Sequence, residues 1–121
     1  MKEEKKESKY TFDLYDRSED AFNACDDNII EVQVESEDRK NITEGTTTYI
    51  YLSRNGLIGL GTELIRFAQE FHPGSHWHME PSTKENMVCC LGVFTAPNSS
   101  NIILCCEEYP PIDECFEEDE E

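Results

Sequence analysis

Residues 46–81, TTTYIYLSRNGLIGLGTELIRFAQEFHPGSHWHMEP, decide the fold of this chain. The stretch begins with β-branched and aromatic residues, passes a glycine-rich turn, and ends in His76-Trp77-His78. Apolar residues alternate at first and then recur at spacings of three and four, which predicts a strand at 47–52 followed by a helix. The stretch also holds the single tryptophan and all three histidines, so any chemistry is expected here.

The helix is predicted to run from Asn55 or Gly56 to Phe71, capped by Ser53 or Asn55. Pro73-Gly74 ends it. Gly59 and Gly61 each cost about 1 kcal/mol relative to alanine inside a helix, and we expect close packing on a sheet to explain both. The buried face is predicted from the spacing of its apolar residues, which are Leu57, Leu60, Leu64, Ile65, Phe67, Ala68 and Phe71.

The strands predicted around this helix lie at 10–15, 29–36, 47–52, 75–80, 87–96 and 101–107. Strand 29–36 is expected to form a hairpin with 47–52, and strand 87–96 is expected to form one with 101–107. The fold class is therefore α+β, a mostly antiparallel sheet of about six strands with one main helix packed on one face, in the order β-β-β-α-β-β-β. Residues 10–108 are predicted to form a single domain, between a disordered N-terminus (1–9) and an acidic disordered tail (109–121).

The formal net charge is −17, and most of it lies toward the two ends. Residues 107–121 contain nine acidic residues and no basic one, whereas 41–106 contain five acidic and three basic residues. Such a field repels nucleic acid and anionic membranes and attracts basic partners. The sequence has no signal peptide and no apolar run of membrane-spanning length, which predicts a cytoplasmic protein.

The motifs of familiar enzymes are missing. The glycine-rich turn has no Lys-Ser/Thr after it, as a phosphate-binding loop would, and Gly56 stands where an acyl-CoA loop has Arg or Gln. No serine lies in a G-x-S-x-G turn. The six cysteines, none in a C-x-x-C spacing, are expected to be free thiols that act as small apolar residues, with one thiol of each Cys-Cys pair in the core and the other outside it. We therefore predict that the protein is not an enzyme and needs no cofactor.

An alternative function comes from His76, His78 and Glu80. On a strand, side chains two residues apart share a face, and two imidazoles with a carboxylate can bind a divalent metal. His72 could add a fourth ligand. This pattern favours a small metal- or ligand-binding domain. The competing interpretation leaves the histidines exposed, with Trp77 and Met79 in the core.

Three motifs carry a family resemblance: Ser53-Arg54-Asn55-Gly56-Leu57, Leu64-Ile65-Arg66-Phe67-Ala68 and His76-Trp77-His78-Met79-Glu80-Pro81. Over about residues 47–106 the chain resembles bacterial immunity proteins of polymorphic-toxin and contact-dependent inhibition systems, and the immunity protein 32 family in particular. It departs from them in its acidic ends and its Cys-Cys pairs. The resemblance implies a non-enzymatic protein that binds one toxin domain and blocks it.

The charge leads to a matching hypothesis. An acidic protein suits the task of covering a basic, nuclease-type active site with carboxylates, and exposed aromatic residues can anchor such a complex. The candidate toxin-binding residues are Glu31, Glu35, Tyr49, Tyr51, Glu117, Glu118 and Asp119.

Overall fold

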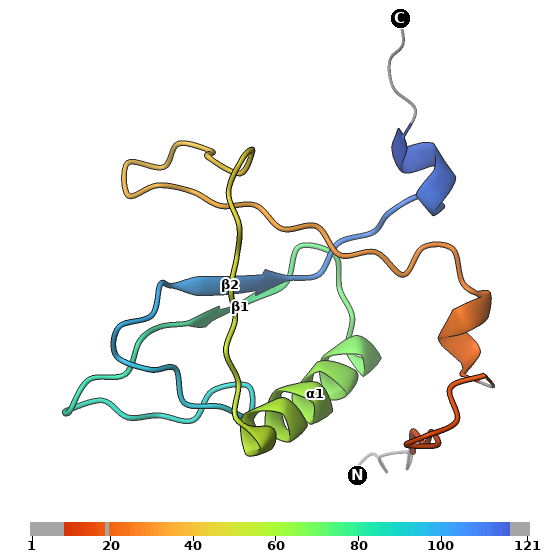
Figure 1. Ribbon diagram of the computed structural model, residues 1–121, viewed down its shortest axis with the longest axis horizontal. Helices are drawn as coiled ribbons and strands as arrows, with labels where there is room; N and C mark the ends of the chain where they lie inside the picture. Colours follow the sequence, from red (N-terminus) through yellow and green to blue (C-terminus); the bar gives the residue numbers. More distant parts are fainter. Residues whose placement is uncertain (1–8, 19, 117–121) are drawn as a thin grey trace, which may run out of the picture. The chain divides into compact units, whose positions relative to one another are not determined.

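A computed structural model describes residues 9–18 and 20–116 (Figure 1). The chain divides into two compact units. One takes the residues up to 31 together with those from 109 on, and the other is Val32–Glu108. Each is described by itself, and the second contains the stretch that decides the fold.

The first unit carries two short 3₁₀ helices, η1 (Ala21–Ala24) and η2 (Ile112–Phe116). The Ile112 N–H donates to the Asp26 carbonyl at 2.7 Å, which joins the two parts of this unit. The strand predicted at 10–15 is wrong. The Asp13 carboxylate accepts the backbone N–H groups of Tyr15 and Asp16, each at 2.9 Å, and this local turn bends the chain out of an extended path.

The second unit contains a helix, α1 (Arg54–Gln69), and two antiparallel strands, β1 (His76–Met79) and β2 (Ile102–Cys105). His76 lies opposite Cys105, and Met79 lies opposite Ile102. Beyond the strands, the Cys106 N–H donates to the Ser75 carbonyl at 2.8 Å and so extends the pairing. The strands predicted at 75–80 and 101–107 are therefore confirmed as elements.

The predicted six-stranded sheet is wrong, because the described residues form one sheet of two strands. Strand β2 pairs with β1 and not with residues 87–96. Those residues fold back on themselves: Cys90 and Val93 exchange two backbone hydrogen bonds, of 2.8 and 3.2 Å. Between them Leu91 and Gly92 both have positive φ, 55° and 79°, as in the tight two-residue turns of hairpins.

The predicted hairpin between 29–36 and 47–52 is also wrong, because the chain turns back earlier. The Ile42 N–H donates to the Val34 carbonyl at 2.8 Å, and the Ser36 N–H donates to the Lys40 carbonyl at 2.9 Å. Residues 40–42 thus take the position against 34–36 that was expected for 47–52. Residues 47–52 run as an extended trace into α1 (Figure 1).

Helix α1 starts and ends within two residues of the prediction. Ser53 caps it, since its Oγ accepts the Gly56 N–H at 3.0 Å. Its Phe67 ring meets the Trp77 ring of β1 edge to face, at an interplanar angle of 81°. The predicted buried face is wrong: none of α1 is fully buried, and the residues of that face that are exposed are Leu57, Leu64, Ala68 and Phe71. A two-stranded sheet is too narrow to cover a whole helix face.

Helix α1 also packs closely against the turn at 90–93, where Gly59 lies against Gly92. A Cβ on Gly59 would collide with the Gly92 carbonyl oxygen and lie 3.0 Å from its carbonyl carbon. Close packing therefore explains Gly59, although the surface is a turn and not a sheet. The same explanation is wrong for Gly61, where a Cβ would have nothing within 4 Å.

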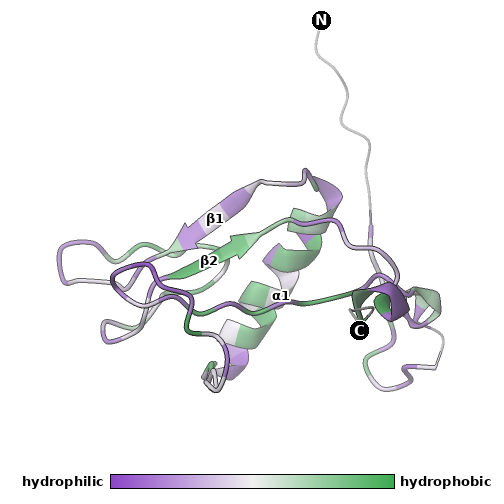
Figure 2. Ribbon diagram, turned by 90° about the horizontal axis from the view of Figure 1, so that it is seen from above, coloured by the Kyte–Doolittle hydropathy of each residue, from purple (hydrophilic) through white to green (hydrophobic). Residues whose placement is uncertain are grey.

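Burial is concentrated around the strand pair. Met79 and Cys106, 5% and 7% exposed, are the only buried hydrophobic residues in the part of the chain that the structure describes. Trp77 is half-buried on the Met79 side of β1, while His76 and His78 are exposed on the other side. Strand β1 is mainly hydrophilic and β2 hydrophobic (Figure 2). The small core leaves many apolar side chains at the surface.

Candidate functional site

Tyr49 and Tyr51 form the most exposed aromatic pair of the second unit, at 73% and 88% of their surface. They lie two residues apart on the extended segment 47–52, so their side chains share one side of the backbone. Their rings stack, with centroids 6.2 Å apart and an interplanar angle of 12°. The pair forms a flat, exposed aromatic surface on one side of the segment.

The candidate acids Glu31 and Glu35 belong to different units. Glu31 accepts a hydrogen bond from the Tyr109 hydroxyl at 2.6 Å. Glu35 forms an isolated antiparallel bridge with Asn41. Both residues are exposed.

The remaining candidates of the acidic tail, Glu117, Glu118 and Asp119, lie outside the described residues. The structure therefore does not test them. Their contribution to a contact surface stays a prediction from charge alone.

His76 and His78 lie as neighbours on the exposed face of β1. Their ring centroids are 5.1 Å apart, and the His76 Nδ1 is 3.3 Å from the Gly74 carbonyl oxygen. Glu80 follows the end of β1. Over residues 9–18 and 20–116, no group of three histidine, cysteine or acidic side chains could hold a metal ion. The metal-binding alternative thus has no support from the arrangement of these side chains.

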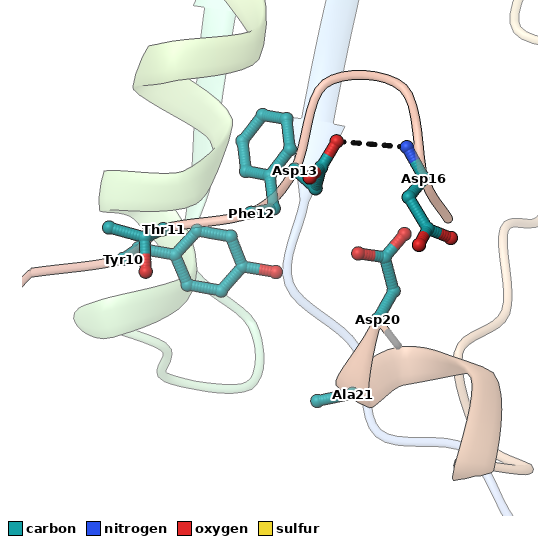
Figure 3. A pocket seen from close by; sticks show the side chains of 7 residues that line it. All are labelled: Tyr10, Thr11, Phe12, Asp13, Asp16, Asp20 and Ala21. Carbon is teal, nitrogen blue, oxygen red and sulfur yellow. Dashed lines mark hydrogen bonds between the residues drawn. The ribbon is translucent and has the colours of Figure 1, made fainter. Parts of the chain in front are cut away.

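A hollow of about 300 Å³ in the first unit was not anticipated from the sequence. The carboxylates of Asp13, Asp16 and Asp20 gather on one side of it and the rings of Tyr10 and Phe12 on the other (Figure 3). A basic side chain would meet negative charge and aromatic surface together in such a hollow.

Two of these carboxylates are held in their ionised form. The pKa of Asp13 is lowered from its usual value because the carboxylate accepts the backbone N–H of Asp16 and that of Tyr15. The pKa of Asp16 is lowered by hydrogen bonds from the Ser18 hydroxyl and backbone N–H, of 2.7 and 3.0 Å. The hollow is therefore negatively charged at neutral pH.

The sequence did contain a signal for this hollow. Asp13 interrupts the alternating aromatics of 10–15, and Asp16 and Asp20 follow it at spacings of three and four. An aspartate that precedes free backbone N–H groups commonly forms a local turn rather than continuing a strand. Giving this tendency more weight than the aromatic alternation would have predicted a turn at Asp13.

The family model for immunity protein 32 matches residues 47–107, half of the chain's length. The chain belongs to the immunity protein 32 family. Comparisons with curated proteins and with solved structures gave no match. The resemblance seen in the sequence is confirmed, and membership supports an immunity function against a toxin.

The immunity protein 32 match has a clear position in the structure. It lies entirely within the second unit and runs from the exposed tyrosine segment through α1 and β1 to the residues after β2. Tyr49 and Tyr51 are inside it, whereas Glu31, Glu35 and the aspartate hollow are outside it. Among the described helices, none is long and apolar enough to cross a membrane.

Proposed function

We propose that this member of the immunity protein 32 family binds a cognate toxin domain of basic, nuclease type and neutralises it by covering its active site. The family membership carries the proposal, since proteins of this kind protect a cell from a toxin. We place its action in the cytoplasm, within a polymorphic-toxin or contact-dependent inhibition system. It acts by binding and not by catalysis.

The charge supports the choice of a basic toxin. The chain has 27 acidic against 10 basic residues, and the ionised Asp13 and Asp16 add a local negative surface. Opposite charges steer two proteins together and raise the association rate well above that of neutral partners. Rapid capture suits an inhibitor that meets a toxin already inside the cell.

The exposed apolar residues support binding over catalysis. Tyr49 and Tyr51 of the second unit are exposed aromatics, and tyrosines at the centre of an interface carry a large share of binding energy. A protein that buries so little of its own apolar surface gains stability by covering it with a partner.

Co-expression with the product of the adjacent open reading frame, as the candidate toxin, tests the proposal. Cells that make the active toxin together with this protein should grow, while cells that make the toxin alone should stop growing. A catalytically inactive toxin serves as the control for expression burden. The proposed function would be refuted if cells that make the toxin stop growing although they also contain a soluble excess of this protein over the toxin.

A further inference from the structure

Residues 47–52 form an extended segment that pairs with no strand of the described chain. Among the described residues they make no backbone hydrogen bond to another part of the chain. The sheet consists of β1 and β2 alone and does not include them. Six extended residues span about 20 Å, which is the length of an ordinary strand.

The composition of this segment is that of a strand. It reads TTYIYL, so β-branched and aromatic residues make up five of its six positions, and these residue types are enriched in sheets. Its N–H and C=O groups alternate in direction along the backbone. Another extended polypeptide is the partner that matches such an alternating row, as in recognition by strand addition.

We propose that the segment 47–52 is a docking strand that pairs with an extended, basic segment of the cognate toxin to form a shared β-sheet. The inference rests on the proposed function and identifies the part of the protein that makes the contact. Tyr49 and Tyr51 contact the toxin on one side of the shared strand. Ile50, 63% exposed, contacts it on the other.

The net charge favours a toxin segment over a second copy of this chain as the partner of the docking strand. The second unit has ten acidic and five basic residues, and the whole chain carries −17. Two copies would repel each other, whereas a basic segment would be attracted. The segment itself has no charge, so its backbone can pair without a desolvation penalty for charged side chains.

The extent of the family match adds an independent argument. The match begins at residue 47, the first residue of the docking strand. Within the described part of the chain these residues neither pair in a sheet nor enter the buried core. A segment that belongs to the shared domain of an immunity family, and whose backbone pairs with no strand of that domain, is suited to contact the toxin.

Amide hydrogen exchange on the full chain tests the docking strand. The probe is the toxin domain that this protein neutralises in the co-expression test, made inactive by substitution of its catalytic residue. The amides of 47–52 should exchange freely in the protein alone and about tenfold or more slowly in the complex. Unchanged exchange of these amides in a saturated complex would overturn the inference while leaving the proposed function intact.

A pair of variants provides the second readout. Ile50→Pro removes one backbone donor and should weaken toxin binding about tenfold or more. Ile50→Thr keeps the donor and the strand preference, so it should retain most of the affinity. The far-UV circular dichroism signal of α1 serves as the control that both variants fold. The N–H groups of residues 50 and 51 point in opposite directions, so one of them faces the partner strand. If both Ile50→Pro and Tyr51→Pro bind as the wild type does, the docking strand is wrong.

Two further outcomes are distinguishable. Protection of 47–52 that appears in the toxin-free protein as its concentration rises would assign the segment to a second copy and overturn the toxin as occupant. A wild-type protein that fails to bind the toxin at all would instead overturn the proposed function, and the inference with it.

Discussion

Gly59 of α1 and Gly92 of the turn at 90–93 touch backbone to backbone, with no side chain between them. This contact joins the helix to a segment more than thirty residues away. Each of the two glycines leaves no room for a Cβ in the other's direction. The position of α1 in the second unit depends on this approach and on the contact of Phe67 with Trp77.

Gly59→Ala should destabilise the protein by about 1–3 kcal/mol, because the added methyl group forces the helix and the turn apart. Gly61→Ala is the matched control. It places the same methyl group in open space on the same helix and should stabilise the protein by up to about 1 kcal/mol through helix propensity. Urea denaturation of both variants measures the difference, and equal effects would contradict the contact.

Ser53→Ala should cost about 1 kcal/mol, because the Ser53 Oγ accepts the Gly56 N–H at the start of α1. Asn55→Ala is the control, since Asn55 lies inside the helix and does not cap it. Its replacement should be neutral or slightly stabilising. Thermal melts followed at a helix wavelength measure both, and a larger loss for Asn55→Ala would identify Asn55 as the cap.

The lowered pKa of Asp13 predicts an acid transition in the first unit. A carboxylate whose pKa is depressed on folding contributes stability above its unfolded value, and this contribution is lost as the pH falls through the folded value. The turn at 13–16 should therefore loosen below pH 3.8, the usual value. The amide shifts of Tyr15 and Asp16 should report the midpoint by NMR.

Asp13→Asn should abolish this transition, because the amide can still accept both N–H groups but does not titrate. The remaining carboxylates of the unit provide the internal reference. A midpoint at or above pH 3.8 for the wild type would show that the two backbone hydrogen bonds do not hold Asp13 in its charged form.

Reversing the charge of Glu117, Glu118 and Asp119 to lysine should lower the association rate with the toxin at low salt. Rim charges act mainly on the association rate, and added salt screens them. Stopped-flow mixing at low and high salt measures the effect, which should shrink as salt increases. A rate unchanged at low salt would remove the tail from the interface.

Helix α1 and strands β1 and β2 could be predicted from the sequence, whereas the pairing of the strands and the two 3₁₀ helices could not. The Ser53 cap and the spacing of apolar residues give α1, and alternation around Trp77 gives β1. Which strands pair depends on contacts distant in sequence, which periodicity does not encode. The apolar run at 87–96 looked like one strand, yet Gly92 at positive φ turns it back.

The candidate site, too, could be predicted from the sequence only in part. Tyr49 and Tyr51 were predicted as exposed aromatic anchors, and in the structure both are exposed and their rings stack. The aspartate hollow was missed because Asp13 forms a local turn that competes with the strand pattern. The hydrogen bonds of Asp13 join residues only two and three positions apart. A prediction that gave more weight to turn-forming residues would therefore have identified this turn.

The uncharged segment at 47–52 also affects how the free protein behaves at high concentration. Six strand-forming residues without proline, glycine or charge have the composition that stacks into cross-β fibrils. The acidic residues elsewhere in the chain oppose this stacking, because every added copy brings a net charge of −17. The acidic composition should therefore keep free copies of the protein from stacking through this strand, and salt that screens the charge should remove the protection.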